Sequence, residues 1–177
     1  ATGVRIIAGR FRGRSLVNVG KGDPGAHLRP TTDRVRESLF NMLGGGRFGD
    51  PFDGRAVLDL FAGTGALGLE ALSRGAGHVT FVDDGRVAGR LLRDNIATLG
   101  VQAETRTLKC DARRLPQAEA PCGLVFLDPP YGKGLGEVAL AAARDQGWIA
   151  AGALIVWEET APQTAPEGFA PLDSRRY

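Results

Sequence analysis

Cysteine and histidine are scarce in this chain. The two cysteines, Cys110 and Cys122, lie in separate segments with no CxxC spacing and no histidine close by. This pattern predicts two reduced thiols in a cytosolic protein and argues against a disulfide or a metal site. Long apolar runs are also lacking, and the first residues do not follow the basic-then-apolar order of a signal peptide. We therefore expect a cytoplasmic protein without a membrane segment.

Positive charge is concentrated near the start, although the whole chain carries a net charge of only +2. Residues 1–47 hold nine basic and three acidic side chains, whereas residues 48–177 are mildly acidic. A basic arm on an acidic body favours contact with phosphates. We expect residues 1–47 to form a basic extension docked on a single body of 48–177. The candidate phosphate contacts in this extension are Arg10, Arg12, Arg14, Arg29 and Arg34.

The extension is predicted to combine a β-hairpin with a helix. Apolar-leaning runs at 4–7 and 15–19 flank a polar turn rich in glycine and arginine, which is typical of a hairpin. After a proline-containing loop, apolar residues recur at helical spacing over 35–43. Arg34 and Arg36 fall off this apolar stripe, so we expect both to lie outside the core.

The body alternates between strands and helices. Chain lengths and turn residues between the apolar runs suit a parallel sheet, so we predict a doubly wound, Rossmann-like α/β fold with helices on both faces. The expected strands are 56–60, 78–83, 102–108, 123–127 and 153–158, and the expected helices are 67–74, 87–99 and 135–146.

A glycine-rich loop follows the first strand of the body. Its sequence matches G-x-G-x-x-G between a strand and a helix, and Gly63, Thr64, Gly65 and Gly68 are candidate cofactor contacts. Asp83 follows about 20 residues after the loop begins, at the end of the second strand, where a carboxylate can bind ribose hydroxyls. On this signal alone, NAD, FAD and S-adenosylmethionine all remain open.

Three further residues extend the candidate cofactor site. Asp59 lies within the first strand, where its charge would repel a dinucleotide pyrophosphate but attract the cationic amino and sulfonium groups of S-adenosylmethionine. Asp111 follows the third strand and can accept a hydrogen bond from an adenine amino group, although a plain turn aspartate is the alternative. Phe61 stands between Asp59 and the glycines. Together these residues favour S-adenosylmethionine as the cofactor.

The fourth strand of the body ends in Asp128, Pro129, Pro130 and Tyr131. Two prolines stiffen this turn because each fixes its own φ and lacks a backbone donor. A carboxylate, a backbone carbonyl and an aromatic ring are then held together where they can grip a planar amine. These four residues are the catalytic candidates, and a simple turn beside a core tyrosine is the alternative.

In order and spacing, residues 57–68, Asp83 and residues 128–131 resemble a class I S-adenosylmethionine-dependent methyltransferase of the amino-group type. The start of the chain resembles the RsmD-type bacterial small-subunit ribosomal RNA guanine-N2 methyltransferases, and the segments that carry this likeness are 5–9, 12–14, 29–31, 33–37 and 40–41. The resemblance implies methylation of one guanine of 16S rRNA within a 30S particle or its precursor, with RNA as the partner of the basic extension. We expect a monomer.

Two departures and three alternatives accompany this resemblance. Family members usually continue past Tyr177 with a Gly-Asp-Thr stretch and a final antiparallel strand, so we expect the sheet here to lack that strand. Asp83 and Asp84 stand where glutamate is common. The first alternative is a DNA or RNA adenine-N6 or other amino methyltransferase. Among these, a DNA adenine-N6 or cytosine-N4 enzyme would normally need a target-recognition insert, for which 177 residues leave little room. An NAD-binding oxidoreductase would need a better-placed acid than His27 or His78, and a non-catalytic RNA-binding module would not need the Asp-Pro-Pro-Tyr turn.

Overall fold

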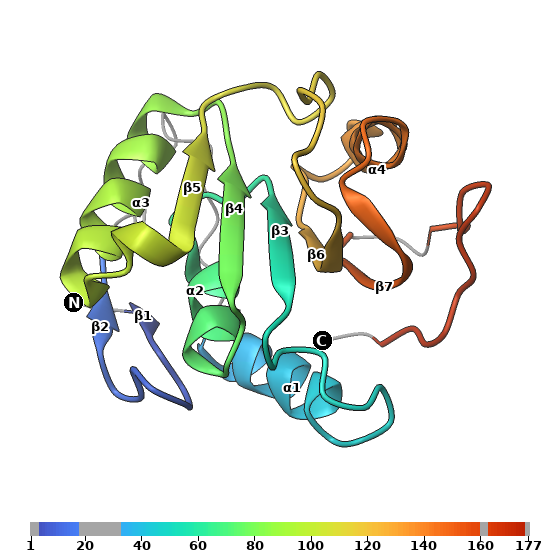
Figure 1. The fold of residues 1–177 in the computed structure, drawn as a ribbon. Helices are drawn as coiled ribbons and strands as arrows, with labels where there is room; N and C mark the ends of the chain where they lie inside the picture. Colours follow the sequence, from blue (N-terminus) through green and yellow to red (C-terminus); the bar gives the residue numbers. More distant parts are fainter. Residues whose placement is uncertain (1–3, 18–32, 160–162, 176–177) are drawn as a thin grey trace.

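The body of the protein is a five-stranded, all-parallel β-sheet. A computed structural model describes residues 4–17, 33–159 and 163–175. The sheet order is β5-β4-β3-β6-β7, and every neighbouring pair is parallel. Arrowheads of β3, β4 and β5 point to the same edge in Figure 1. The strands are β3 (Ala56–Leu60), β4 (His78–Val82), β5 (Thr105–Leu108), β6 (Cys122–Leu127) and β7 (Ile149–Trp157).

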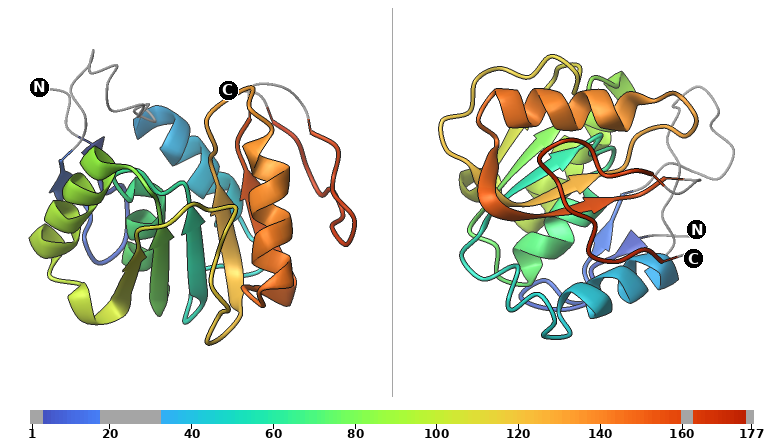
Figure 2. Two further views of the ribbon diagram at one scale, coloured as in Figure 1. Left: turned by 90° about the horizontal axis from the view of Figure 1, so that it is seen from above. Right: turned by 90° about the vertical axis from the view of Figure 1, so that its right-hand side faces the viewer.

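Helices cover both faces of this sheet, which confirms the predicted fold class. The helices are α1 (Asp33–Leu43), α2 (Ala66–Ser73), α3 (Arg86–Leu99) and α4 (Leu135–Asp145). Successive strand residues alternate between two apolar clusters, so that Phe126 joins the core shared by α1, α2 and α3, while Leu127 joins the core under α4. The right-hand view of Figure 2 shows α4 and α1 on opposite sides of the sheet.

Two predicted strands begin three or more residues from the predicted position, whereas the other strand bounds agree to within one residue. Gln102–Glu104 form a short 3₁₀ helix instead of the first residues of the strand predicted at 102–108, and the Thr105 hydroxyl donates to the Val101 carbonyl at 2.9 Å. At the other edge of the sheet, β7 begins four residues earlier than the predicted 153. Gly152 has a φ of 75°, which lets the strand continue through an irregular register with β6.

The N-terminal hairpin is present but short, with β1 (Val4–Arg5) antiparallel to β2 (Ser15–Leu16). Its buried side chains join the core that α1, α2 and α3 share. The hairpin is also anchored through its backbone, because the Glu70 carboxylate on α2 accepts hydrogen bonds of 2.9 and 3.1 Å from the N–H groups of Ile7 and Ala8. Apolar burial and a buried acceptor therefore hold the hairpin on α2.

The prediction that Arg36 lies outside the core is wrong. Its side chain on α1 is fully buried, and it donates to the Asp33 carboxylate and to the Arg5 carbonyl. The Glu70 carboxylate is 3.9 Å away, and burial lowers the pKa of Arg36 despite these neighbours. A cation at this position can be buried because two carboxylates surround it, and one of them comes from a distant helix.

Candidate cofactor and catalytic site

The glycine loop begins directly after β3. The N–H of Ala62 donates to the Val82 carbonyl at 3.0 Å, and Gly65 then closes a turn onto the Ala62 carbonyl at 2.9 Å. Gly65 has a φ of 84°, and a Cβ atom there would lie 2.4 Å from Leu92 Cδ1. Backbone conformation and close packing thus both require glycine at the start of α2.

Asp59 lies buried beneath this loop. Its Oδ2 accepts a 3.0 Å hydrogen bond from the backbone N–H of Gly68 in the first turn of α2. Burial raises the pKa of Asp59 well above its ordinary value, and the negative charges of Asp128, Asp83 and Glu158 raise it further against the opposing effect of the Gly68 bond. A cationic group bound nearby would stabilise the ionised carboxylate. This environment fits the amino and sulfonium groups of S-adenosylmethionine.

Asp83 connects the end of β4 to the same loop. Its two carboxylate oxygens accept hydrogen bonds from the N–H groups of Gly63 at 2.9 Å and Gly85 at 2.8 Å. Burial raises the pKa of Asp83, and these two backbone bonds oppose that shift. Because each carboxylate oxygen can accept more than one bond, Asp83 retains the capacity to bind a ribose hydroxyl.

A pocket lies where the loops after β3, β4, β5 and β6 meet. Four predicted site residues line it: Phe61, Asp83, Asp111, and Pro130 of the Asp-Pro-Pro-Tyr turn. Phe61 has a φ of 58°, a conformation that non-glycine residues adopt at an energetic cost. The other lining residues, which sequence reasoning did not assign to the site, are Asp84, Cys110, Ala112, Arg113 and Leu135.

Asp111 enters the pocket already paired with Arg113. The Arg113 guanidinium donates to both Asp111 oxygens at 2.7–3.2 Å, and the Arg113 backbone N–H adds a bond of 2.9 Å. The hydrogen bonds from the Arg113 side chain are the largest cause that lowers the pKa of Asp111 to about 2, and the bond from the Arg113 backbone adds to them. The carboxylate is therefore ionised at neutral pH and held in one orientation. The sequence analysis did not assign Arg113 to the site. Its position two residues after Asp111 is the only sequence signal that could have identified it.

The Asp128 turn leaves β6 beside the tip of β3. The backbone N–H of Asp128 lies 3.5 Å from the Leu60 carbonyl, and the Glu158 N–H donates to the Leu127 carbonyl at 2.9 Å. Pro129 is buried, whereas 40% of Tyr131 is exposed to solvent. The turn therefore presents an accessible ring at the edge of the sheet where the glycine loop and Asp59 lie.

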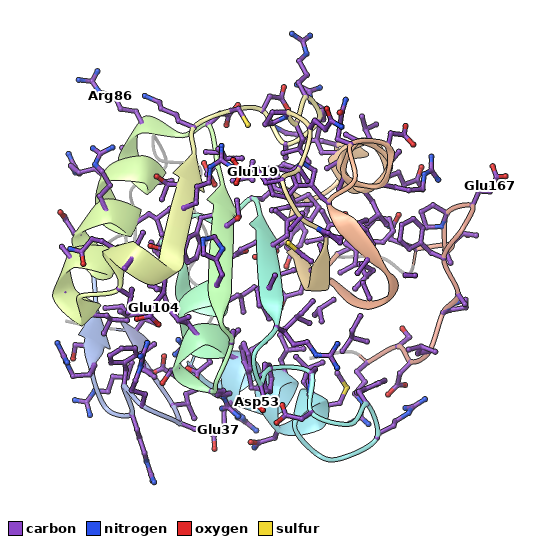
Figure 3. The ribbon with its side chains drawn as sticks, in the orientation of Figure 1. Glu37, Asp53, Arg86, Glu104, Glu119 and Glu167 are labelled. Atoms are coloured by element: carbon purple, nitrogen blue, oxygen red, sulfur yellow. The ribbon has the colours of Figure 1, made fainter. Side chains whose placement is uncertain are left out.

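The candidate RNA contacts differ in how they are held. Arg10 pairs with Glu104 at 2.7 Å and lies over the Phe11 ring, and Arg14 donates to the Thr98 carbonyl at 2.7 Å. Arg12 and Arg34 are exposed, while Arg29 lies outside the described residues. Figure 3 shows Glu104 near the hairpin, and it shows Arg86 pointing outward from the start of α3. Arg86 is a further exposed cation that sequence reasoning left out of the site.

Two negative findings concern the described part of the chain. Within residues 4–17, 33–159 and 163–175, none of the helices combines the length and the hydrophobicity that a membrane span requires. In the same ranges, no cluster of histidine, cysteine and carboxylate side chains has the arrangement of a metal site.

Comparison with known proteins gives consistent matches over most of the chain. Residues 4–177 match the family described as Conserved hypothetical protein 95. The chain is 42% identical over 164 residues to Ribosomal RNA small subunit methyltransferase D of Escherichia coli strain K12, covering 92% of this chain and 78% of that protein. It is 45% identical over 132 residues to the Putative rRNA methyltransferase YlbH of Bacillus subtilis strain 168, covering 72% and 67%. The solved structure of the putative methyltransferase yhhF from Escherichia coli aligns with a TM-score of 0.78 at 41% identity, covering 95% and 88%.

Proposed function

The chain belongs to the family described as Conserved hypothetical protein 95, and we propose that it transfers a methyl group from S-adenosylmethionine to the exocyclic N2 amine of a guanine in small-subunit ribosomal RNA. Its relatives bear names of ribosomal RNA methyltransferases, which supports the substrate class. The observation that carries the proposal is a single pocket. It joins Asp83 and Asp111, which the sequence analysis assigned to ribose and adenine, with Pro130 of the turn that is predicted to hold the target amine.

The residues around the pocket fit S-adenosylmethionine. Asp83 offers acceptors for ribose hydroxyls, and the Asp111 carboxylate is held ionised by Arg113 so that it can accept from the adenine amino group. Asp59 supplies a buried carboxylate beside the loop, and a bound cation would stabilise its ionised form. The bound cofactor would supply an electrophilic methyl group on a sulfonium, and the sulfur would keep the bonding electron pair when the methyl group is transferred.

The Asp-Pro-Pro-Tyr turn would hold and activate the amine. The Asp128 carboxylate and the Pro129 carbonyl accept the two amine N–H bonds, and the Tyr131 ring stacks on the base. Acceptors in these positions direct the nitrogen lone pair toward the methyl carbon and stabilise the positive charge that develops on nitrogen. Alignment of the nitrogen with the methyl group and sulfur contributes further. After transfer, Asp128 accepts the proton that the nitrogen loses.

The base must leave its stack to reach this turn, as in other enzymes that modify bases. An unpaired guanine in an RNA loop costs least to extract. The Tyr131 ring is suited to receive such a base because 40% of the residue is exposed to solvent and it follows directly after Pro130, which lines the pocket.

The test is transfer of tritiated methyl groups by the wild type and by Asp128→Ala, on naked 16S rRNA and on 30S particles. We expect the variant to lose at least about 100-fold in rate, while S-adenosylhomocysteine binds within about twofold of the wild type. Glu167→Ala is a charge-matched control, because Figure 3 shows Glu167 pointing away from the body. Nucleoside analysis should give N2-methylguanosine. Methyl transfer by the variant at the wild-type rate contradicts the mechanism, and N6-methyladenosine as the product contradicts the guanine assignment.

A further inference from the structure

Asn95 joins the N-terminal hairpin to the glycine loop. It lies on α3 and is fully buried. Its Oδ1 accepts a 2.6 Å hydrogen bond from the Val17 N–H, and its Nδ2 donates to the Val17 carbonyl at 3.0 Å and to the Thr64 carbonyl at 2.9 Å. The amide orientation follows from this set, because a flipped amide would face one N–H and two carbonyls with the wrong groups. One side chain thus ties the residue after β2 to the middle of the glycine loop.

The helix that follows the glycine loop holds the other end of the hairpin. The Ser73 hydroxyl at the end of α2 donates to the Ala8 carbonyl at 2.6 Å and accepts from the Phe11 N–H at 2.9 Å. The Ser73 carbonyl accepts from the Arg10 N–H at 2.8 Å. Gly9 lies so close that a Cβ atom there would come within 1.9 Å of this carbonyl. The hairpin therefore contacts both the loop and α2.

These contacts divide into two functions by their location. Ser73 and Glu70 fix the hairpin on α2 and make no hydrogen bond to the turn formed by residues 62–65. Asn95 alone among the side chains described here donates both to the hairpin backbone and to the loop backbone. If the hairpin opens, Asn95 loses its two hydrogen bonds to Val17. Its Nδ2 group, which donates to the Thr64 carbonyl, is then no longer held in position by the hairpin. The loop conformation is then less strongly fixed.

We propose that Asn95 is a positioning residue that makes the N-terminal hairpin part of the cofactor site, so that hairpin closure and cofactor binding stabilise each other. The proposal rests on the proposed function in that it takes the glycine loop to be the cofactor loop. Coupling of this kind is reciprocal. A ligand that binds only the ordered loop must also reduce local opening of the hairpin, even though it does not touch the hairpin. Substrate contacts made by the hairpin arginines would strengthen cofactor binding by the same route.

The test is hydrogen exchange of the intact chain with and without saturating S-adenosylhomocysteine, combined with calorimetric binding of that probe. In the wild type, exchange of the amides over residues 4–17 should slow about tenfold on binding, and the Val17 amide should be among those affected. Asn95→Ala should bind the probe about tenfold more weakly and lose the ligand-dependent slowing. In methyl transfer, its KM for S-adenosylmethionine should rise by more than its kcat falls.

Two control variants separate positioning from general destabilisation. Ser73→Ala loosens the hairpin at its far end, so its amides should exchange faster while probe affinity and ligand-dependent slowing stay within about twofold of the wild type. Asp94→Ala removes an exposed neighbour on the same helix and should change neither quantity. Wild-type probe binding without any slowing over residues 4–17 overturns the inference, whether or not Asn95→Ala folds. A wild type that does not bind the probe overturns the proposed function and the inference together.

Discussion

The Asp59 carboxylate accepts a 3.0 Å hydrogen bond from the backbone N–H of Gly68, and this bond caps a helix from a neighbouring strand. α2 has no side-chain cap of its own, because it begins after Gly65. The first-turn N–H groups of a helix lack intrahelical partners, so an acceptor from β3 satisfies one of them. The carboxylate of Asp59 that caps α2 therefore also lies beneath the loop that would hold a cationic cofactor.

Asp59→Asn should separate these two roles. The amide keeps an acceptor for the Gly68 N–H but carries no charge. Because burial raises the pKa of Asp59, its ionisation opposes folding, and this cost grows as the pH rises above the ordinary aspartate value of about 4. We expect Asp59→Asn to have a higher Tm than the wild type at pH 7 and the two Tm values to converge at low pH. Cofactor affinity should fall about tenfold. Equal Tm values at pH 7 would contradict this account.

Gly68→Ala should destabilise the fold. A Cβ atom at this position would lie 2.5 Å from Phe81 Cε1 and 2.8 Å from Val79 Cγ1, and both are buried side chains of β4. Urea denaturation should show a loss of about 1–3 kcal/mol. Gly89→Ala on α3 is the matched control, because the atom nearest to its Cβ is 4.0 Å away on Arg93. That substitution should stabilise the protein by about 0.5–1 kcal/mol. Equal effects of the two substitutions would be inconsistent with the packing described here.

The sequence predicted the glycine loop, the Asp-Pro-Pro-Tyr turn and the parallel sheet because each depends on local patterns. Apolar runs bounded by glycine or proline identify strand ends, and parallel strand ends share one edge of a sheet. The family that the start of the chain resembles is confirmed by the match over residues 4–177. Arg36 was mispredicted because its burial depends on Glu70, which periodicity within α1 cannot reveal. Leu135, the first residue of α4, also lines the pocket, but no motif or spacing in the sequence distinguishes it from the other apolar residues of that helix.

Glu70→Gln should reveal the cost of leaving Arg36 uncompensated. Glu70 and Arg36 side chains are both fully buried, and Glu70 also accepts from Arg74 Nε at 2.9 Å. Removing one member of a buried ionic network leaves an unpaired buried charge, so we expect a loss of about 3–5 kcal/mol in urea denaturation. Asp33→Asn removes a carboxylate that is 46% exposed and should cost no more than about 1 kcal/mol. The ranking of the two variants is decisive. Equal losses would mean that the partly exposed Asp33 stabilises the buried Arg36 as much as the buried Glu70 does.

Arg113→Ala should raise the pKa of Asp111 from about 2 toward the ordinary aspartate value of about 4. The depressed pKa means that Asp111 contributes stability above its ordinary pKa, and this contribution is lost as the pH falls toward about 2. Carboxyl chemical shifts followed by NMR across pH 1.5–6, roughly the window that these two values define, measure the change directly. Lys109→Ala is a control that removes a nearby cation from the same loop. A titration of Asp111 that is identical in Arg113→Ala and the wild type would show that the guanidinium does not hold it.

The arginines of the extension should divide into structural and RNA-contacting groups. Arg10 and Arg14 are tied to Glu104 and to the Thr98 carbonyl, so replacing them should loosen the hairpin as well as weaken RNA binding. Arg12 and Arg34 are exposed, and the double variant Arg12→Gln, Arg34→Gln should keep the wild-type Tm. Each phosphate contact that is lost lowers the slope of log K against log salt by about 0.7–0.9, so the double variant should lose roughly 1.5 in slope.

The control for this measurement is Arg144→Gln at the end of α4, which lies on the opposite face of the sheet from α1. Its slope should equal that of the wild type, because a cation remote from the RNA releases no counterions on binding. A slope that falls equally in both variants would assign the salt dependence to net charge. A slope that does not fall in the double variant would remove Arg12 and Arg34 from the interface. Among the candidates that the structure describes, only Arg10 and Arg14 would then remain, and because both also hold the hairpin, their replacement could not change RNA affinity without changing stability.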